Sequence, residues 1–453
     1  MPHDPWQLSL AAPLPAAVRP GRGLLLPLAG RCSHHGTGAR VALAAGPGPA
    51  DEADAWAMPV ATGGGVLADA FWGLVPLGPV TAPNEAEVRV SAHAPGGARL
   101  ERIVGRLRLE PEPEPHPGPA GDAQLVAVCM ATCDPQPALL AAQIASLRAQ
   151  RHERWVCVIC DDASSPAGLA AVRREIAGDG RFALIEGRER AGAYRTFERC
   201  LRHVPDGAGV VALCDQDDRW HPDKLGRLLA ALGPGVQLAH SDVRLVDPAG
   251  RVLAPTYWTD RTRSEEDIAD LLLANTVTGM ASLFRRELLD AVLPLPAPLG
   301  PDAFHDHWIA LIAAARGRIA WVGQPLADYV QHDANVLGHR GRRVERSTAS
   351  RWERWQGSYV DLLFPRRALA ATLLLRCGAD LDARRRRDLA RIAAPTPAHL
   401  AAAALRAPAR RRRTLGHEWR MLRGELWRAR AHARPGPAVA LRRDLADLMA
   451  PIT

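Results

Sequence analysis

Acidic side chains gather directly after two of the apolar segments in the middle of the chain. Residues 161–162 read Asp-Asp and follow the apolar run 155–160, and residues 215–218 read Asp-Gln-Asp-Asp and follow the run 210–214. Five carboxylates brought together by two strand ends would repel one another unless a cation lay between them. Mg²⁺ and Mn²⁺ are held by one or two carboxylates together with phosphate oxygens of a substrate. The pattern therefore predicts a divalent-cation site that binds a diphosphate ligand.

A second group of polar residues lies downstream. The segment 275–279 reads Asn-Thr-Val-Thr-Gly, Asp306 stands just before the predicted helix 309–315, and His332 follows Tyr329 at a distance of three residues. A carboxylate near a helix N-terminus can act as a general base, although the helix dipole favours its ionised form. Asp306 could instead only cap its helix, and His332 could be a hydrogen-bonded core residue. A turn with a helix cap is likewise an alternative explanation of the Asp-Asp pair.

The elements that must position these residues alternate between strands and helices. Apolar runs at 125–130, 155–160, 182–185 and 210–214 alternate with helical patterns at 137–150, 166–178, 193–203 and 222–232. Apolar strands separated by helices are typical of a parallel sheet that is covered on both faces, the α/β class. Ligands of such sheets bind at the carboxyl ends of the strands. Both acidic segments are expected at that edge.

The first 110 residues show a different pattern. Short apolar runs recur between glycine- and proline-rich turns, which predicts a small all-β, sandwich-like domain. In the run 103–109, Ile103, Leu107 and Leu109 are expected on one face and the arginines on the other. Residues 111–121 are rich in proline and predict an extended linker. The α/β domain is then expected over residues 122–340.

Residues 341–453 predict a basic, arginine-rich helical region. From Arg340 to the end the chain has 26 Arg and 10 Asp plus Glu, a net charge of +16, whereas the whole chain carries +8, so residues 1–339 carry −8. We favour a peripheral contact with anionic membrane, or with a lipid-linked acceptor, over a merely solvated face. Nucleic-acid binding is disfavoured, because the region has no recognition motif and no interleaved aromatic residues.

Composition and cysteine usage point to an intracellular protein. Lys224 is the only lysine among 57 basic residues, which we interpret as a bias of a GC-rich genome. The eight cysteines lie mostly in apolar runs, and Cys157 and Cys160 would point to opposite faces of one strand, so buried reduced thiols are favoured over a metal or redox site. No signal peptide and no membrane-spanning run are visible. The predicted location is cytoplasmic, with at most peripheral attachment to the inner face of the plasma membrane.

Several ordered motifs between Val126 and Gly338 resemble the family-two inverting glycosyltransferases of GT-A fold, and among them the bacterial rhamnosyltransferase-like members. The motifs are Met-Ala-Thr-Cys-Asp at 130–134, Cys-Asp-Asp-Ala-Ser at 160–164, Gly-Ala-Tyr-Arg-Thr-Phe at 192–197, Cys-Asp-Gln-Asp-Asp-Arg-Trp-His-Pro-Asp-Lys-Leu at 214–225, Ser-Asp at 241–242, Asn-Thr-Val-Thr-Gly at 275–279, His-Asp-His-Trp at 305–308 and Gln-His-Asp-Ala-Asn-Val-Leu-Gly at 331–338. Each motif alone is weak, but their order and spacing together are specific. The resemblance covers a little under half of the chain and implies a GT-A nucleotide-diphospho-sugar transferase domain.

The resemblance also implies roles for individual residues. The expected nucleotide-sugar contacts are Thr132, Asp161, Asp162, Asp215, Gln216, Asn275 and Gly279, with Asp162 accepting a hydrogen bond from a pyrimidine base. Asp215 and Asp217 are the carboxylates of the D-x-D motif, and Asp217 would bind Mn²⁺ or Mg²⁺ with help from Asp215 and His332. Asp306 would be the base that deprotonates the acceptor hydroxyl. Many relatives have Tyr-Asn where this chain has Cys133-Asp134, which puts the stacking contact to the nucleotide base in doubt.

The implied reaction is the transfer of a hexose or deoxyhexose, such as rhamnose, with inversion at the anomeric carbon. The donor would be a nucleoside-diphosphate sugar of the dTDP or UDP type, and the acceptor a hydroxyl of a cell-surface, cell-wall or lipid-linked glycan. A sugar nucleotidyltransferase or a dinucleotide dehydrogenase is disfavoured, because residues 132–136 contain no glycine-rich phosphate loop. A non-catalytic carbohydrate-binding protein would leave the ordered carboxylates unexplained.

Overall fold

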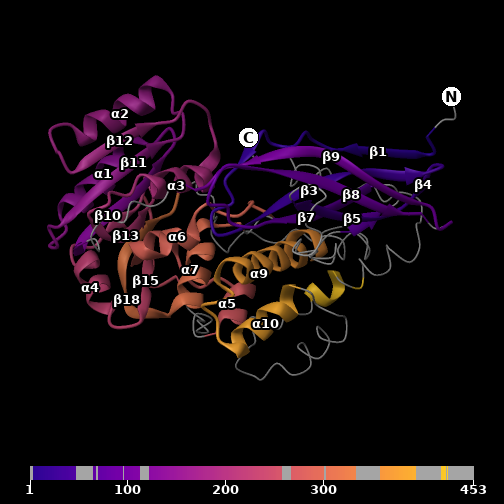
Figure 1. Ribbon diagram of the computed structural model, residues 1–453. Coiled ribbons are helices and arrows are strands. Elements are labelled where there is room, and N and C mark those ends of the chain that lie inside the picture. Colours follow the sequence, from indigo (N-terminus) through magenta and orange to yellow (C-terminus); the bar gives the residue numbers. More distant parts are fainter. Residues whose placement is uncertain are drawn as a thin grey trace.

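The computed structural model describes residues 4–46, 65–67, 70–94, 96–112, 122–257, 267–299, 303–332, 358–393, 420–424 and 426. These residues form two stacked N-terminal sheets, a central sheet with helices on both faces, and further helices that follow it in the chain (Figure 1). This arrangement confirms the predicted order of a sheet domain, an α/β domain and C-terminal helices.

The N-terminal region is a β-sandwich. Its strands are β1 (Trp6–Leu10), β2 (Ala17–Val18), β3 (Leu24–His34), β4 (Thr37–Gly38), β5 (Arg40–Gly46), β6 (Gly65–Leu67), β7 (Ala70–Leu77), β8 (Asn84–His93) and β9 (Arg99–Leu109). One sheet has the order β1-β3-β7-β6, with β4 attached to β3, and the other has the order β2-β9-β8-β5. Strand β8 shows the cause, since Ala86, Val88, Val90 and Ala92 alternate with more exposed residues and enter the core between the sheets.

The expectation for Ile103 is wrong. Leu107 and Leu109 are buried as predicted, but Ile103 is 49% exposed. The pairing of β8 with β9 shifts register here, because Val88 pairs with Gly105 and the next residue, Arg89, pairs with Ile103. One extra residue in a strand reverses the faces of all residues beyond it. The bulge therefore turns Ile103 outward.

The central sheet is mixed. Its strands are β10 (Asp122–Thr132), β11 (Trp155–Asp161), β12 (Phe182–Glu186), β13 (Ala208–Cys214), β14 (Arg219–Trp220), β15 (Val236–Val246), β16 (Val252–Ala254), β17 (Ser282–Arg285) and β18 (Arg318–Val330). The order is β12-β11-β10-β13-β17-β15-β18-β14, with β16 paired to β15. The first four strands are parallel, as predicted. The short β17, which the sequence did not predict as a strand, runs antiparallel to β13 and β15, so the sheet is mixed beyond β13.

Helices cover both faces of this sheet. The helical elements are α1 (Pro137–Arg148), α2 (Pro166–Ile176), α3 (Gly192–Arg202), α4 (Lys224–Ala231), α5 (Ile268–Leu273), η2 (Gly279–Ala281), η3 (Arg286–Leu288), α6 (Leu289–Val292) and α7 (His305–Arg316). Helices α1, α2 and α4 share one hydrophobic cluster with the sheet, and α3, α5 and α7 share the other. Local signals fix their starts; for example, the Ser165 hydroxyl accepts a hydrogen bond from Gly168 N (3.2 Å), and Pro166 begins α2.

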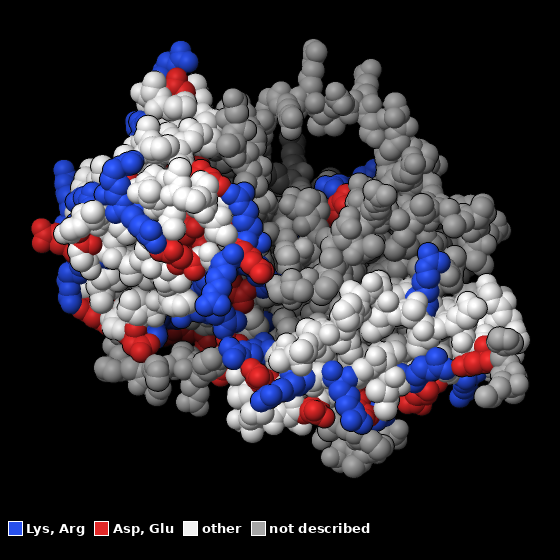
Figure 2. All heavy atoms as spheres, turned by 90° about the horizontal axis from the view of Figure 1, so that it is seen from above, with Lys and Arg blue, Asp and Glu red and all other residues white. Residues whose placement is uncertain are grey.

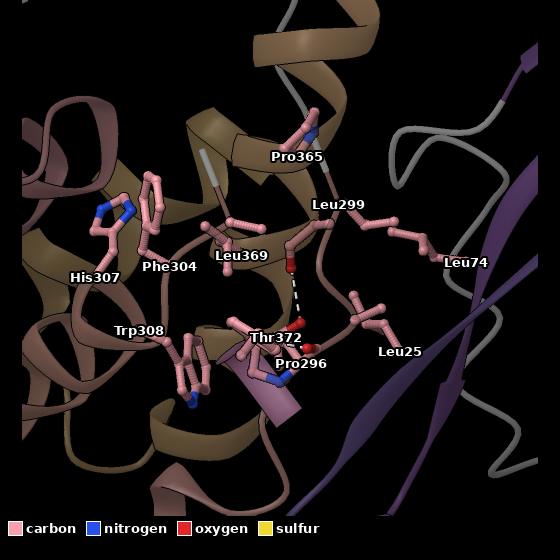
Figure 3. Close-up of a pocket in the computed structure, with 14 residues that line it drawn as sticks. Leu25, Leu74, Pro296, Leu299, Phe304, His307, Trp308, Pro365, Leu369 and Thr372 are labelled. Carbon is pink, nitrogen blue, oxygen red and sulfur yellow. Dashed lines mark hydrogen bonds between the residues drawn. The ribbon is translucent and has the colours of Figure 1, made fainter. Parts of the chain in front are cut away.

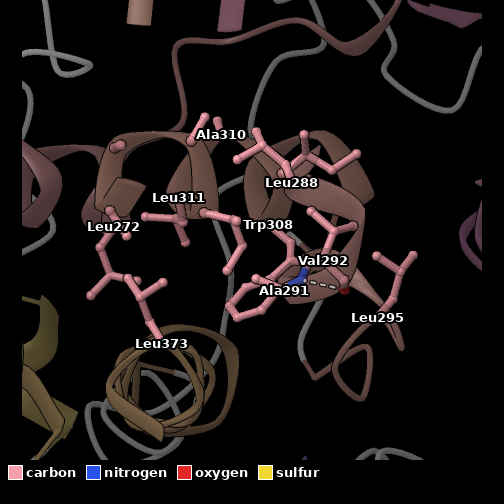
Figure 4. Packing of buried hydrophobic residues seen from close by; sticks show 14 of the residues in the cluster. Leu272, Leu288, Ala291, Val292, Leu295, Trp308, Ala310, Leu311 and Leu373 are labelled. Atoms are coloured by element: carbon pink, nitrogen blue, oxygen red, sulfur yellow. Dashed lines mark hydrogen bonds between the residues drawn. The ribbon is translucent and has the colours of Figure 1, made fainter. Parts of the chain in front are cut away.

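The C-terminal helices belong to the same core as the central domain. The π-helical turn η4 (Tyr359–Leu363), α9 (Phe364–Cys377) and α10 (Ala383–Ala393) pack beside α5 and α7. Figure 4 shows Leu373 of α9 close to Trp308 and Leu311 of α7. Leu25 and Trp72 of the N-terminal sheets enter this cluster too, so the three regions share one core. No helix in the described part of the chain is long and apolar enough to cross a membrane.

Candidate active site

The predicted site residues lie at one edge of the parallel part of the sheet. Thr132, the last residue of β10, pairs with Asp161, the last residue of β11. Two residues earlier on β10, Met130 pairs with Cys214, the last residue of β13. The segments 132–134, 161–165 and 215–218 therefore leave the sheet side by side, as expected for a ligand-binding edge.

The Asp161 carboxylate accepts three hydrogen bonds, from Thr132 and from Ser164. Its Oδ1 accepts from the Thr132 hydroxyl (3.0 Å) and from the Ser164 hydroxyl (2.6 Å), and its Oδ2 accepts from Ser164 N (2.8 Å). Both Thr132 and Asp161 are buried. These two buried side chains thus connect the end of β10 to the end of β11.

Asp162 holds the start of α3. Its two oxygens accept hydrogen bonds from Ala191 N (2.7 Å) and Gly192 N (2.9 Å), and its side chain is buried. These amides precede or begin a helix, where backbone donors lack intrahelical partners. Each carboxylate oxygen still has a further lone pair, so Asp162 can accept one more hydrogen bond from a ligand.

Gln216 joins the first-strand loop to the acidic loop. Cys133 N donates to Gln216 Oε1 (2.8 Å), and Gln216 Nε2 donates to Cys133 O (3.3 Å). The next residue, Asp134, has a positive φ of 40° and accepts from Ser165 N (2.7 Å). The Cys133-Asp134 pair is therefore held as a tight turn against the β11–α2 loop.

The aspartates of the loop after β13 lie close to one another and have fewer hydrogen-bond donors around them than Asp161 and Asp162. The charges of Asp217 and Asp306 add to burial and raise the pKa of Asp215 to about 7. Burial and the charges of Asp215 and Asp217 raise the pKa of Asp218 well above its usual value. Asp218 Oδ1 accepts from Val330 N (3.1 Å), whereas its buried Oδ2 has no hydrogen-bond partner among the described residues. His332 Nε2 lies 2.9 Å from Asp217 Oδ2.

Asp306 lies in the first turn of α7 and reaches back to the 275–279 segment. Its Oδ2 accepts from Gly279 N (2.9 Å), and its Oδ1 accepts from Asn275 Nδ2 (3.2 Å). Burial raises the pKa of Asp306 to about 6, although these hydrogen bonds act in the opposite direction. A Cβ atom at position 279 would lie 3.1 Å from the Asp306 Cβ, so glycine permits the close approach. The structure thus brings Asn275, Gly279 and Asp306 together.

The donor set suits a divalent cation that is shared with a phosphate ligand. Asp217 Oδ2 and His332 Nε2, which lie 2.9 Å apart, offer a carboxylate and an imidazole, a mixture that Mn²⁺ accepts, and Asp215 stands two residues before Asp217. In the described part of the chain, no three acidic, histidine or cysteine side chains converge closely enough to hold a metal by themselves. This agrees with the habit of Mg²⁺ and Mn²⁺ of taking only one or two protein carboxylates and completing their shell with phosphate oxygens and water.

Two participants in this region were not assigned a role from the sequence. Asp218 carries the unpartnered oxygen, and Lys224 lies wholly buried at the start of α4 with its amine donating to Met280 O. Burial lowers the pKa of Lys224 well below its usual value, against the opposing charges of Cys214, Asp218 and Asp215. The signal for Lys224 was its uniqueness in the sequence. Residues 333–338, the end of the last predicted motif, lie outside the described residues.

The histidines that flank Asp306 are structural. His307 Nε2 lies 2.8 Å from Leu271 O, and His305 stacks on Phe197 with ring centroids 3.9 Å apart. Burial lowers the pKa of both histidines to about 3, so both are neutral. Figure 3 shows His307 and Trp308 beside a small apolar cavity between α7, α9 and Leu25 and Leu74 of the sandwich. No carboxylate lines that cavity, so it is separate from the acidic site.

All eight cysteines are free thiols, as predicted, and only Cys133 is not fully buried. Burial raises the pKa of Cys129 and Cys157 well above the usual value, because the charged thiolate is disfavoured in an apolar core. These thiols are therefore core residues. They supply no ligand to the acidic site.

Comparison with known proteins identifies the central domain. Residues 127–293 match the model of glycosyl transferase family 2. Together with the mixed sheet, this match confirms the GT-A fold. The uncharacterized protein y4gI of Sinorhizobium fredii (strain NBRC 101917 / NGR234) is 28% identical over 148 residues, which are 33% of this chain and 14% of that protein. The match therefore spans about one seventh of this relative's own length.

Two solved structures are similar at lower sequence identity. TarS 1–349 of S. aureus, in complex with UDP-GlcNAc, is 16% identical with a TM-score of 0.42, over 65% of this chain and 79% of that one. The mannosyltransferase PcManGT from Pyrobaculum calidifontis, in complex with GDP-Man and Mn²⁺, is 19% identical with a TM-score of 0.37, over 70% of this chain and 89% of that one.

Proposed function

Residues 127–293 belong to glycosyl transferase family 2, and from this premise we propose that the chain transfers a sugar from a nucleoside-diphosphate donor to a glycan hydroxyl with inversion. One observation carries the proposal. Asp306 of α7 is held by hydrogen bonds from Gly279 N and Asn275 Nδ2, and its charge acts on Asp215 in the loop after β13. A carboxylate beside the donor phosphates and a second one beside the acceptor are what a single displacement needs.

Asp306 is the proposed general base. With its pKa raised to about 6, it is largely ionised at neutral pH yet basic enough to accept a proton. Gly279 N and Asn275 Nδ2 fix the orientation of its carboxylate. The acceptor oxygen forms a bond to the anomeric carbon while its proton passes to Asp306. The bond from that carbon to the phosphate oxygen breaks, and its electron pair leaves with the nucleoside diphosphate.

The proposed cofactor is Mn²⁺ or Mg²⁺, held by Asp217 and Asp215 with His332 as a further contact. When bound, such an ion neutralises negative charge on the leaving diphosphate. On the donor side, Asp162 has an acceptor position left for a pyrimidine base, which suits a dTDP- or UDP-linked hexose or deoxyhexose, rhamnose included. Thr132, Asp161 and Gln216 support the loops around that position.

The proposed acceptor is a cell-surface, cell-wall or lipid-linked glycan, reached at the inner face of the plasma membrane. Helix α10 carries exposed arginines that could contact anionic lipid: Arg384, Arg386, Arg387 and Arg391. On the face shown in Figure 2, basic and acidic side chains alternate over the described residues and form no large patch of one sign. The membrane contact proposed for the α10 arginines is peripheral.

The test uses the purified full chain, a panel of nucleotide sugars and a glycan acceptor. We expect transfer with Mn²⁺ or Mg²⁺ that stops on chelation and returns when the metal is restored. Asp306→Asn should lower kcat by about 10³-fold and leave donor affinity unchanged, because general-base catalysis contributes about 10²–10⁴-fold. Asp206→Asn, a half-exposed carboxylate paired with Arg286, is the matched control. Loss of donor binding in Asp306→Asn would remove Asp306 from the base role.

A further inference from the structure

Lys224 is an exception in the composition of the chain. Of 57 basic residues, 56 are arginine, and arginine occupies every exposed basic position. The one lysine stands where a basic side chain is least expected, because Lys224 is 0% exposed. A bias toward arginine explains the other positions but not this one. The position therefore favours an amine over a guanidinium for a reason that lies in its surroundings.

The buried amine has two neighbours of defined geometry. Its Nζ donates a hydrogen bond to Met280 O. It also lies 3.1 Å from the ring centroid of Trp220, in contact with the aromatic face. A carbonyl and a π face satisfy a compact amine, whereas the planar fork of arginine has five N–H donors. Arginine at this position would bury donors without partners.

The contacts of Lys224 connect the two halves of the acidic site. Lys224 begins α4, six residues after Asp218, and the charges of Asp218 and Asp215 act on its amine. Its partner Met280 follows Gly279, whose N–H holds Asp306. The short turn η2 is held from one side by the amine and from the other by the carboxylate. Through this turn the loop of the D-x-D motif is fixed relative to the base.

We propose that Lys224 is a positioning residue of the transferase site, which fixes the Gly279–Met280 turn, and hence Asp306, against the Asp215–Asp218 loop. This inference rests on the proposed function for the meaning of Asp306 as the base. The connection between Lys224 and Asp306 can nevertheless be measured without any sugar transfer.

The single lysine makes that measurement possible. Growth on lysine labelled with ¹³C at Cε gives the full-length protein one labelled side chain, and therefore one lysine signal in NMR spectra. We expect Asp306→Asn to shift this signal, since the change is passed on through Gly279 and Met280. The control Asp247→Asn, in the turn after β15, should leave it in place. An unchanged signal in Asp306→Asn would overturn the connection.

Kinetics of two variants test the positioning role. Lys224→Met keeps the length of the side chain and removes its donor, and Lys224→Arg keeps a basic donor group and changes its shape. We expect both to lower kcat by about 100-fold, the effect of an error of about 1 Å in the placement of reacting groups, with a donor KM within about threefold of the wild-type value. Arg227→Met, on the exposed face of the same helix, should behave as wild type. Wild-type kcat in Lys224→Arg would overturn the proposal.

The two proposals fail in different ways. If the wild-type chain transfers no sugar from any donor, the proposed function fails, and the NMR shift still decides whether Lys224 and Asp306 are connected. If the lysine variants unfold, which thermal denaturation would show, the Asp306→Asn spectrum of the otherwise unchanged chain carries the test. If transfer is robust and the lysine signal ignores Asp306→Asn, only the role of Lys224 is lost.

Discussion

Two acidic loops at the same sheet edge have similar sequences and opposite surroundings. Asp161 and Asp162, after β11, accept hydrogen bonds from a threonine, a serine and three backbone amides. In the loop after β13, Asp218 Oδ1 accepts such a bond from Val330 N and Asp217 Oδ2 lies 2.9 Å from His332 Nε2, while Asp218 Oδ2 has no partner among the described residues. The carboxylates of the first loop are engaged in hydrogen bonds that order the fold. Those of the second loop have fewer partners, and we propose that they bind a cation.

The two loops differ in how many hydrogen-bond donors reach their carboxylates. Hydrogen bonds from amides at a helix start stabilise a carboxylate and order the loops around it. Carboxylates without such donors destabilise one another, which is why the pKa of Asp215 is raised to about 7. We expect a bound cation to reduce this repulsion between the carboxylates. The following predictions test this division between the two loops.

The largest expected effect is on metal binding. Asp217→Asn should weaken Mn²⁺ binding by at least about 100-fold and lower transfer by a similar factor, because a direct ligand counts for more than the outer residues whose loss already costs about 10–100-fold. Asp161→Asn should leave Mn²⁺ affinity within about threefold, since its oxygens are occupied by Thr132 and Ser164. Electron paramagnetic resonance of free Mn²⁺ measures both. Equal losses in the two variants would abolish the distinction between the loops.

The next effect is a pH dependence that belongs to the second loop. Metal binding requires the Asp215 carboxylate to be ionised, so Mn²⁺ affinity should rise about tenfold per pH unit up to about pH 7 and then level off. In the metal-free protein the sign is reversed. A raised carboxyl pKa stabilises the fold below about pH 4, and this contribution is lost as the pH rises through 7.

Thermal denaturation at several pH values, with and without metal, checks both statements. Asp215→Asn should flatten the metal-free curve between pH 4 and 7, because asparagine does not titrate. A metal affinity that is constant from pH 5 to 8 would contradict the elevated pKa of Asp215.

Sequence reasoning found the edge of the sheet but not the state of its carboxylates. Apolar strands followed by Asp-Asp and Asp-Gln-Asp-Asp were enough to place both loops, because the carboxyl ends of parallel strands coincide. Which loop is saturated depends on Ser164, Ala191 and Gly192, whose donors meet the aspartates only in three dimensions. Hydrogen-bond partners that come from other elements leave no local pattern in the sequence.

The features that could not be predicted from the sequence have equally local causes. Ile103 faces solvent because of one bulge residue, which no alternation pattern reports. The reversal at β17 depends on a strand of four residues, too short to show a period. From the sequence, the presence of only one lysine was attributed to a compositional bias, because the contacts of Lys224 with Trp220 and Met280 cannot be seen there.

The smallest expected effect concerns stability and completes the comparison. Asp162→Ala removes both acceptors of Ala191 N and Gly192 N and should lower the free energy of unfolding by about 1–3 kcal/mol, the usual consequence of leaving buried donors unpaired. Chemical denaturation measures it, with Asp206→Ala as a control whose exposed ion pair contributes about 0–1 kcal/mol. Asp218→Asn should act in the other direction, because it removes a buried carboxyl group whose ionised form is disfavoured and whose Oδ2 lacks a hydrogen-bond partner among the described residues. If Asp162→Ala and Asp218→Asn destabilise the metal-free protein equally, the loop after β13 is structural like the loop after β11, and its aspartates do not form a cation site.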